Sequence, residues 1–369
     1  MTKDKLLPAI AALAASLAFA AAAPAQEIKL TLADQNSPNA WGPSNALQPW
    51  VKKVEEASKG RIKIEVYPSQ TLVKGPDMWK AVRSGIVDIG WCFQGYWPEM
   101  TPLSDVIALP GLPMSSAEKG SEVLWKLYER FPAIRKEYAE IQPLVLWTSN
   151  PYFVLTSKKQ VKTLEDLKGL KIRVTGGPPT DQIKALGAVP TPIPMPDVYQ
   201  ALDKGVVDGM GAPWEAVQGF RLYEVAKYYT MVPLSAVYFS LCMNKQKWES
   251  LPTDVRDTIM SVSGLEGSKF WGKNFFDTAE QAVVARQGRE PRDGPLRHPA
   301  RRDGTLEQGR RRADLGRLGQ EDGRQGPQGS PRHPQRHHRA AQELTSAWLR
   351  PHAAAGAGTP AHPTDPSCP

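Results

Sequence analysis

The segment GLKIRVTGGPP, residues 169–179, places a cation where a strand ends. Leu170, Ile172 and Val174 alternate with other residues, which predicts a half-buried strand. Arg173 falls on the opposite face, and two glycines and two prolines follow it. Ligands of open α/β sheets lie beyond the carboxyl ends of the strands, and a guanidinium matches the planar shape of a carboxylate. The pattern therefore indicates an anion site at Arg173 or, equally well, a salt bridge between two parts of the chain.

Aromatic residues are the second group with a bearing on binding. Trp41, Trp91, Trp97 and Trp214 fall in expected loops or at strand ends rather than at helical spacing. The segment DIGWCFQGYWPEM, residues 88–100, holds four aromatic residues in a short stretch. Core filling explains most such residues, but indoles at strand ends also line apolar ligand clefts, so both roles stay open.

Residues that carry out catalysis are scarce. The first histidine is His298, so a Ser-His-Asp or Cys-His arrangement is excluded upstream of it. The sequence has no G-x-S-x-G, G-x-x-x-x-G-K-[ST] or G-x-G-x-x-G motif and no metal-ligand spacing. Paired carboxylates such as Glu55 and Glu56 are typical of a solvated helix face. We therefore expect a binding protein that is not an enzyme, with no catalytic residue and no metal site.

The first 25 residues predict a secretory signal peptide. Lys3 and Lys5 give a charged start, an apolar run follows, and Ala23-Pro24-Ala25 gives a small-residue cleavage site. No later segment is apolar enough to cross a bilayer. We therefore expect an exported protein from which residues 1–25 are removed.

The composition changes abruptly at residue 287. From Gln287 to Pro369 there is no Lys, Ile, Val, Phe, Tyr, Met or Asn, and all six histidines fall there. The segment is either a disordered basic tail or GC-rich DNA read out of frame, and the missing residue types, mostly those with AT-rich codons, favour the second interpretation. We expect residues 287–369 to be disordered.

The same segment explains the net charge of the chain. It has 14 Arg against 9 acidic residues and so supplies most of the net charge of +8. The positive charge therefore does not indicate a nucleic-acid partner.

Three cysteines are present. Cys92 and Cys242 each lie in an apolar run, and Cys368 lies in the atypical tail. An exported protein could oxidise the first two, but their apolar surroundings predict buried thiols rather than a disulfide.

Two kinds of segment recur about a hundred residues apart. GRIKIEVYP from Gly60 and GLKIRVTGG from Gly169 predict similar strands. WKAVRSGIVDIG from Trp79 and YQALDKGVVDGM from Tyr199 each predict a helix, a glycine that ends it, and a strand. Helical and strand patterns alternate around them, so the predicted fold class is α/β with two similar lobes.

Several separated motifs agree in order with one known family. They are YPSQTL, SGIVDIG, LPGLP, the stretch Asp166–Gly209 and RLYEVAKYYT. From Ile28 to about Ala285 the chain resembles the solute-binding proteins of tripartite ATP-independent periplasmic (TRAP) transporters, of the C4-dicarboxylate-binding type. The resemblance implies a two-lobed periplasmic binding protein fold that closes on an organic acid. It also implies delivery of this ligand to a permease with a large and a small membrane subunit.

The resemblance further implies domain boundaries and a role for Arg173. One lobe would comprise residues 26–150 and 239–278, the other residues 151–238 and 279–286, with the chain crossings as a hinge. Arg173, the Arg of the K-I-R-V motif, would pair with the ligand carboxylate. The family's last long helices would be missing from this chain. No cofactor is expected, although a sodium ion accompanies the ligand in some members.

Departures from the family pattern indicate the kind of ligand. Ala212 stands where dicarboxylate and sialic-acid binders often carry Asn, and Tyr152-Phe153 stands where some carry a second basic residue. Trp214 adds an aromatic surface, and Glu215 beside it resembles members that bind 2-oxo acids. We therefore expect a monocarboxylate, a 2-oxo acid or an aromatic acid rather than a dicarboxylate.

The expected site thus has one cationic anchor, polar groups and aromatic walls. Arg173 is the anchor, and Glu215 or Gln94 would meet a hydroxyl or keto oxygen. The predicted walls are Trp41, Trp91, Phe93, Tyr152, Phe153 and Trp214. A ligand-sensing periplasmic binding protein of a signalling system is the alternative function.

Overall fold

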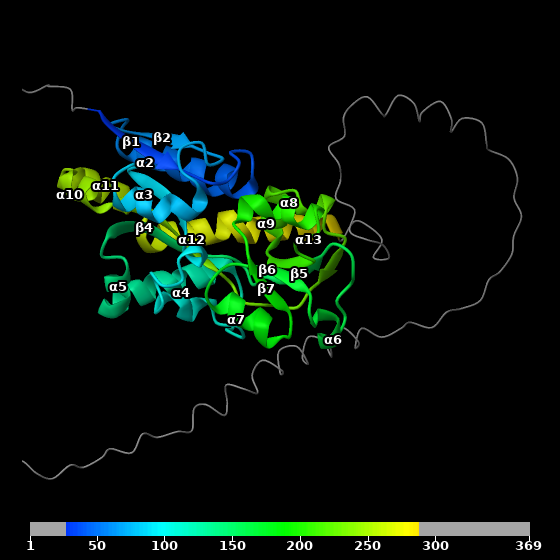
Figure 1. Ribbon diagram of the computed structural model, residues 1–369. Coiled ribbons are helices and arrows are strands. Elements are labelled where there is room, and N and C mark those ends of the chain that lie inside the picture. The colour runs from blue at the N-terminus through cyan, green and yellow to red at the C-terminus, as the bar shows by residue number, and fades with distance from the viewer. Residues whose placement is uncertain (1–26, 288–369) are drawn as a thin grey trace, which may run out of the picture.

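Two five-stranded sheets form the centre of the protein (Figure 1), and the computed structural model describes residues 27–287. The first sheet has the order β2-β1-β3-β10-β4, with β1 (Ile28–Ala33), β2 (Ile62–Tyr67), β3 (Ile89–Phe93), β4 (Ile141–Thr148) and β10 (Tyr238–Asn244). The second has the order β7-β6-β8-β5-β9, with β5 (Phe153–Thr156), β6 (Lys171–Val174), β7 (Val189–Pro192), β8 (Gly209–Ala212) and β9 (Tyr228–Thr230). The predicted α/β class with two similar units is therefore confirmed.

Helices connect the strands and cover the sheets. The α-helices are α2 (Gln48–Ala57), α3 (Met78–Arg83), α4 (Ala117–Arg130), α5 (Pro132–Glu137), α6 (Leu164–Leu167), α7 (Pro178–Ala185), α8 (Val198–Asp203), α9 (Trp214–Gly219), α10 (Lys245–Ser250), α11 (Thr253–Ser261), α12 (Gly264–Gly272) and α13 (Thr278–Gln287). The 3₁₀ and π turns are η2 (Pro43–Leu47), η3 (Gly75–Asp77), η4 (Gln94–Tyr96), η5 (Ser104–Ala108), η6 (Met195–Asp197), η7 (Leu222–Glu224) and η8 (Lys273–Asp277). No helix within residues 27–287 is long and apolar enough to span a membrane.

The helix-glycine-strand repeat is reproduced in three dimensions. Gly85 after α3 and Gly205 after α8 both have positive φ, 76° and 70°, which glycine adopts without strain. In the first sheet, an oxygen of Asp88 accepts a hydrogen bond of 2.8 Å from the backbone N–H of Thr31. In the second, Asp208 accepts one of 2.9 Å from the N–H of Lys171. Each aspartate thus joins the start of its own strand to the neighbouring parallel strand.

The similar segments GRIKIEVYP and GLKIRVTGG do not occupy equivalent positions in the two sheets. GRIKIEVYP forms β2, which is an edge strand, whereas GLKIRVTGG forms β6, which lies between β7 and β8. The strand of the first sheet that occupies the place of β6 is β1, between β2 and β3. The shared letters therefore reflect similar strand composition and not equivalent positions.

The prediction of free thiols at Cys92 and Cys242 is wrong, because the two residues form a disulfide. They lie on the adjacent antiparallel strands β3 and β10, with Cα atoms 6.5 Å apart. Both are fully buried, as expected, but the sequence could not show that these two strands are neighbours.

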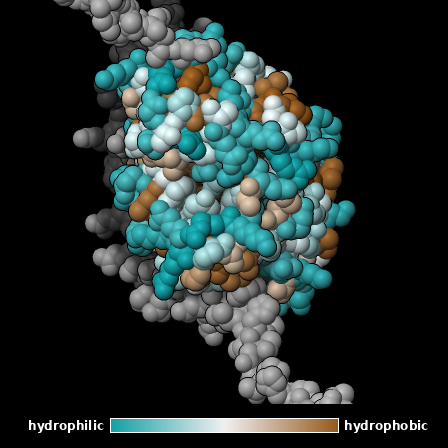
Figure 2. Space-filling model, turned by 90° about the vertical axis from the view of Figure 1, so that its left-hand side faces the viewer, coloured by the Kyte–Doolittle hydropathy of each residue, from teal (hydrophilic) through white to brown (hydrophobic). Residues whose placement is uncertain are grey.

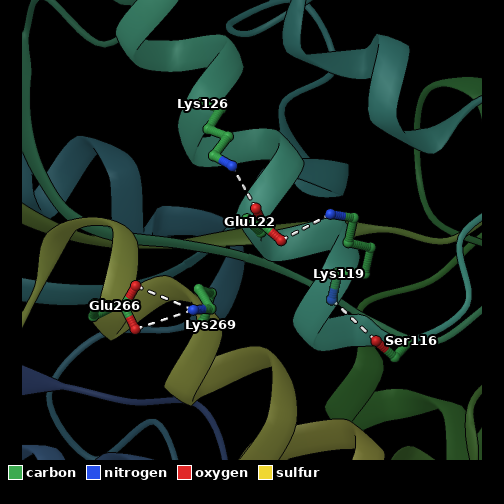
Figure 3. A network of polar contacts seen from close by, with 6 residues as sticks. All are labelled: Ser116, Lys119, Glu122, Lys126, Glu266 and Lys269. Atoms are coloured by element: carbon green, nitrogen blue, oxygen red, sulfur yellow. Dashed lines mark hydrogen bonds and ion pairs between the residues drawn. The ribbon is translucent and has the colours of Figure 1, made fainter.

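The surface is mostly polar. Figure 2 shows one end of the molecule, where hydrophobic side chains form small, separate spots among hydrophilic ones. On the exposed sides of α4 and α12, Lys119 and Lys126 bind Glu122, and Lys269 binds Glu266 (Figure 3). Hydrogen bonds from the two lysines lower the pKa of Glu122 to about 2. Such exposed pairs contribute little to stability.

Within residues 27–287 the chain crosses between the two units after β4, before β10 and after α12. The crossings after β4 and before β10 hydrogen-bond to each other, with 2.9 Å from the N–H of Ser149 to the carbonyl of Val237 and 2.7 Å from the N–H of Leu234 to that of Tyr152. The third crossing follows α12, which together with α13 runs along the middle of the molecule (Figure 1). The lobe boundaries and the hinge stay predictions. The predicted signal peptide and the tail beyond residue 287 lie outside the described residues.

Asp277 connects the third crossing to the first. One carboxylate oxygen accepts hydrogen bonds from the N–H of Ala117, at 2.8 Å, and from the side chain of Asn150, at 2.7 Å. The other oxygen accepts one of 2.9 Å from the N–H of Glu118. The buried carboxylate therefore satisfies the first free N–H groups of α4 and holds the segment between β4 and β5.

We expect Asp277→Ala to lower the free energy of unfolding by about 2–4 kcal/mol, because three buried donors lose a charged acceptor. Asp277→Asn should lie between this variant and the wild type. Urea denaturation followed by circular dichroism measures the effect, with Asp257→Ala on the exposed side of α11 as the control. Equal stability of the alanine variant and the control would contradict this role for Asp277.

Candidate functional site

Parallel strands of both sheets end at one common place. Asp34 follows β1, Phe93 ends β3, Arg173 precedes the last residue of β6, and Met195 and Glu215 are each the third residue after a strand, β7 and β8 respectively. Four of the five line a single cavity, and Asp34 lies beside it through its neighbour Gln35. The site therefore lies where open α/β sheets bind their ligands, beyond the carboxyl ends of the strands.

Arg173 is the cation of this site. Its side chain is only 1% exposed, and its Nε donates a hydrogen bond of 2.9 Å to the carbonyl of Ile193. Its Nη2 has no hydrogen-bond partner, and no carboxylate within the described chain pairs with it. Burial lowers the pKa of Arg173, and the nearby hydroxyls of Tyr96 and Tyr152 oppose this shift. A buried guanidinium without an ion pair is costly, which indicates a place made for an anion.

The cavity beside Arg173 is small, with a volume of about 30 Å³. It is lined by Gln35, Asn36, Trp91, Phe93, Tyr152, Arg173, Met195, Pro213, Glu215, Ala216, Phe220, Phe239, Phe275 and Phe276. A second space of about 10 Å³ shares Tyr152 and Arg173 with it. Benzene occupies a cavity of about 150 Å³, whereas one water needs roughly 10–15 Å³. An organic molecule therefore enters only if the walls move apart.

The two sheets contribute different residues to this cavity. The first sheet supplies most of the rings: Phe93 and Phe239 stack with centroids 4.8 Å apart, and Trp91 is tilted against Phe239 with centroids 5.0 Å apart. Phe275 and Phe276 of η8 extend the same ring cluster. The second sheet supplies Arg173 and, through α9, Glu215. Rings from the first sheet and charged groups from the second therefore line one cavity.

Two buried carboxyl groups belong to this region: Glu215 lines the cavity, and Asp34 lies beside it. Glu215 is 5% exposed, and burial raises its pKa to about 8, although the N–H of Gly42 donates to it. Asp34 is fully buried, and burial raises its pKa to about 7 despite hydrogen bonds from Asn36. The charge of Asp34 raises the pKa of Glu215 further. Both groups therefore hold a proton more tightly than an exposed carboxyl does.

Direct hydrogen bonds close the cavity across the two sheets. The N–H of Gly176 donates to the carbonyl of Gly95 at 2.7 Å, and a Cβ atom at Gly176 would lie 2.7 Å from that oxygen. The hydroxyl of Tyr96 donates to Gln35 at 3.1 Å and accepts from the N–H of Met195 at 2.9 Å. The glycines after Arg173 thus allow the two sheets to approach each other closely.

Five of the predicted site residues line the cavity: Arg173, Glu215, Trp91, Phe93 and Tyr152. The other four are placed elsewhere: Gln94, Phe153, Trp214 and Trp41. Gln94 is buried and donates to the hydroxyl of Ser240 at 2.6 Å. Phe153 and Trp214 pack on each other with centroids 4.6 Å apart, and Trp214 also stacks on Tyr229. The indole N–H of Trp41 donates to Thr278 on α13 at 2.9 Å.

Sequence reasoning missed Tyr96 and the rings of Phe239, Phe275 and Phe276. Tyr96 belongs to the aromatic segment 88–100, so the clustering of aromatic residues there could have indicated it. The three phenylalanines are distant in sequence from the aromatic segment: the pairing of β10 with β3 brings Phe239 to the cavity, and the η8 turn brings Phe275 and Phe276.

A larger cavity of the described chain lies elsewhere and has a volume of about 240 Å³. Its lining is almost wholly apolar, with Pro110, Leu112, Val154, Leu186 and Val232 among the residues, and no charged side chain faces it. The larger volume therefore does not make it the anion site, because an anion needs a cation and this cavity has none.

Two α/β units whose strands end beside one buried cation are typical of a two-lobed solute-binding protein. A sequence model described as bacterial extracellular solute-binding protein, family 7, matches residues 35–281. The chain therefore belongs to this family, the solute-binding proteins of TRAP transporters, as the resemblance predicted.

Three solved structures are similar to the chain. A TRAP solute-binding protein from Rhodoferax ferrireducens T118, in complex with copurified benzoate, has a TM-score of 0.66 and 32% identity, with 70% of this chain and 83% of that one covered. A TRAP solute-binding protein from a marine metagenome, in complex with 3-hydroxybenzoate, has a TM-score of 0.67 and 34% identity, with 71% of this chain and 82% of that one covered. A TRAP periplasmic solute-binding protein from Bordetella bronchiseptica with bound mandelate has a TM-score of 0.67 and 28% identity, with 72% of this chain and 84% of that one covered. The chain spans about two thirds of the length of several curated relatives that it matches.

The pKa of Glu215 predicts a pH dependence of stability. The folded state holds this proton up to about pH 8, whereas the ordinary pKa is 4.5, so the unfolded state loses it first. The resulting stabilisation is present below about pH 4.5 and is lost as the pH rises to about 8, at about 1.4 kcal/mol per pKa unit.

We expect the melting temperature of the wild type to fall from pH 5 to pH 8 by several degrees more than that of Glu215→Gln, since about 1 kcal/mol corresponds to roughly 2–4 °C. Differential scanning fluorimetry at both pH values measures this difference. Glu249→Gln on exposed α10 serves as the control. Parallel pH profiles of the wild type and Glu215→Gln would contradict the assigned pKa shift.

Proposed function

We propose that this chain is the periplasmic substrate-binding subunit of a TRAP transporter, which captures an organic acid anion and delivers it to the membrane permease. The observation that carries the proposal is the guanidinium of Arg173, buried at the cavity with an unpartnered Nη2. A ligand carboxylate supplies the missing partner, and in a closed site this charge-assisted pair is strong.

The preferred ligand of this proposal is a monocarboxylate with an apolar or aromatic body. Arg173 is the one cationic residue among those lining the cavity, and Glu215 faces the same space. A second carboxylate would meet an acidic side chain and no second cation, which disfavours dicarboxylates. The rings of Trp91, Phe93 and Phe239 suit an aromatic body, and the similar proteins described above bind benzoate, 3-hydroxybenzoate and mandelate.

A sodium ion accompanies the ligand in some members of the family, and this chain could bind one as well. Carboxylate oxygens suit such a hard cation, and Glu215 is the carboxyl group of the cavity that would hold it. Within residues 27–287 no group of three or more His, Cys, Asp or Glu side chains surrounds one point. A sodium ion would therefore depend on the ligand and on backbone oxygens as well.

The mechanism of capture follows from the contacts across the cavity. In the open state the ligand carboxylate reaches Arg173, and closure then forms the Gly95–Gly176 and Tyr96–Met195 hydrogen bonds. Excluding water strengthens the ion pair, so the ligand stabilises the closed state. A large and a small permease subunit would recognise this closed form. No observation on the described residues favours the alternative of a signalling receptor.

We expect Arg173→Ala to weaken binding of benzoate or 3-hydroxybenzoate by about 2–5 kcal/mol, because the ligand charge is left buried and unpaired. Isothermal titration calorimetry measures the affinity. Arg83→Ala, which removes an exposed arginine paired with Glu140, is the control and should bind as the wild type does. Unchanged affinity of Arg173→Ala would remove this residue from the site and the proposal with it.

A further inference from the structure

Glu215 and Asp34 are two buried carboxyl groups that the anchoring of a carboxylate does not use. Glu215 follows β8 of the second sheet and lines the cavity, whereas Asp34 follows β1 of the first sheet and lies beside it. Asp34 binds Asn36 through Oδ1, at 2.7 Å to the side chain and 3.0 Å to the backbone, whereas its Oδ2 is buried without a partner. A buried polar atom left unpaired requires an explanation.

Tyr152 lines the cavity together with Arg173 and Glu215. Burial raises the pKa of Tyr152, the charge of Arg173 opposes this shift, and the charge of Glu215 adds to it. Burial lowers the pKa of Arg173, the two tyrosines oppose this shift, and Glu215 is not among the groups that influence it. Within the described residues Arg173 and Glu215 therefore face one cavity without forming an ion pair.

A ligand held by Arg173 therefore carries its body toward Glu215. The rings of Trp91, Phe93 and Phe239 contact that body but offer it no charge. A protonated carboxyl both accepts and donates a hydrogen bond, so Glu215 is suited to a neutral polar group rather than to a second anion. An unsubstituted body leaves the carboxyl buried against carbon, which costs free energy.

Resting on the proposed function, we propose that Glu215 determines specificity by hydrogen bonding to a hydroxyl group on the body of the ligand. The preferred substrate class is then a hydroxylated aromatic monocarboxylate. Gln94, the other residue considered for this role, donates to Ser240 through Nε2 and does not line the cavity, so the structure favours Glu215 over it. A buried site that pairs with a hydroxyl rejects the analogue that lacks it, because its own polar group stays unsatisfied.

The test compares benzoate with its 2-, 3- and 4-hydroxy isomers by isothermal titration calorimetry. The wild type should bind one hydroxy isomer at least about tenfold more tightly than benzoate, as one hydrogen bond of roughly 1.4 kcal/mol requires. Glu215→Leu should lose this preference and still bind benzoate, and Glu215→Gln should retain part of it. Glu249→Gln is the control, and melting curves show that each variant is folded.

The outcomes separate this inference from the proposed function. Glu215→Leu that binds all four acids with the wild-type order of affinity overturns the inference alone. Wild type that binds none of them, or Arg173→Ala that binds them all unchanged, overturns the proposed function. Repeating the titrations with potassium in place of sodium tests the other role of Glu215. If the absence of sodium and the Glu215 substitutions both weaken the binding of all four acids equally, Glu215 holds a cation. This result overturns the proposed hydrogen bond from Glu215 to the ligand hydroxyl.

Discussion

A buried positive charge without a protein partner is the constraint on which this structure depends. The guanidinium of Arg173 is held by one carbonyl, that of Ile193, and lies close to the hydroxyls of Tyr96 and Tyr152. These neutral groups orient the cation but do not neutralise it, so its charge remains for a ligand. A nearby protein carboxylate would have stabilised the closed protein alone and made the ligand unnecessary.

The surroundings of the cation follow from the same constraint. The first sheet contributes most of the rings together with Gln35 and Asn36, and the second contributes Arg173 and Glu215, so neither sheet alone lines the whole cavity. Gly176 allows the second sheet to reach the backbone of the first, and Gly42 allows Phe275 to lie against its backbone. Asp277 holds the chain crossings in place. In the proposed mechanism, closure assembles the site, and its energy depends on what lies between the two sheets.

Much of this arrangement could be predicted from local patterns. The K-I-R-V strand with glycines after it located the cation, and the repeated glycine-valine-aspartate turn located the strand pairs that Asp88 and Asp208 join. Other predictions depended on neighbours that the sequence does not show. Trp214 looked like a cleft residue but packs between Phe153 and Tyr229, and two cysteines 150 residues apart proved to be bonded.

By itself the sequence determined the elements, the two similar units, the family and the residue that carries the charge, because these depend on periodicity, turn residues and motifs within short stretches. Only the tertiary structure decided which residues surround that charge. Phe239 and Phe276 reach the cavity through the pairing of β10 with β3 and the turn at η8, and Glu215 meets Asp34 only when the two sheets approach. Contacts between distant segments follow from the packing of whole sheets, which no local pattern encodes.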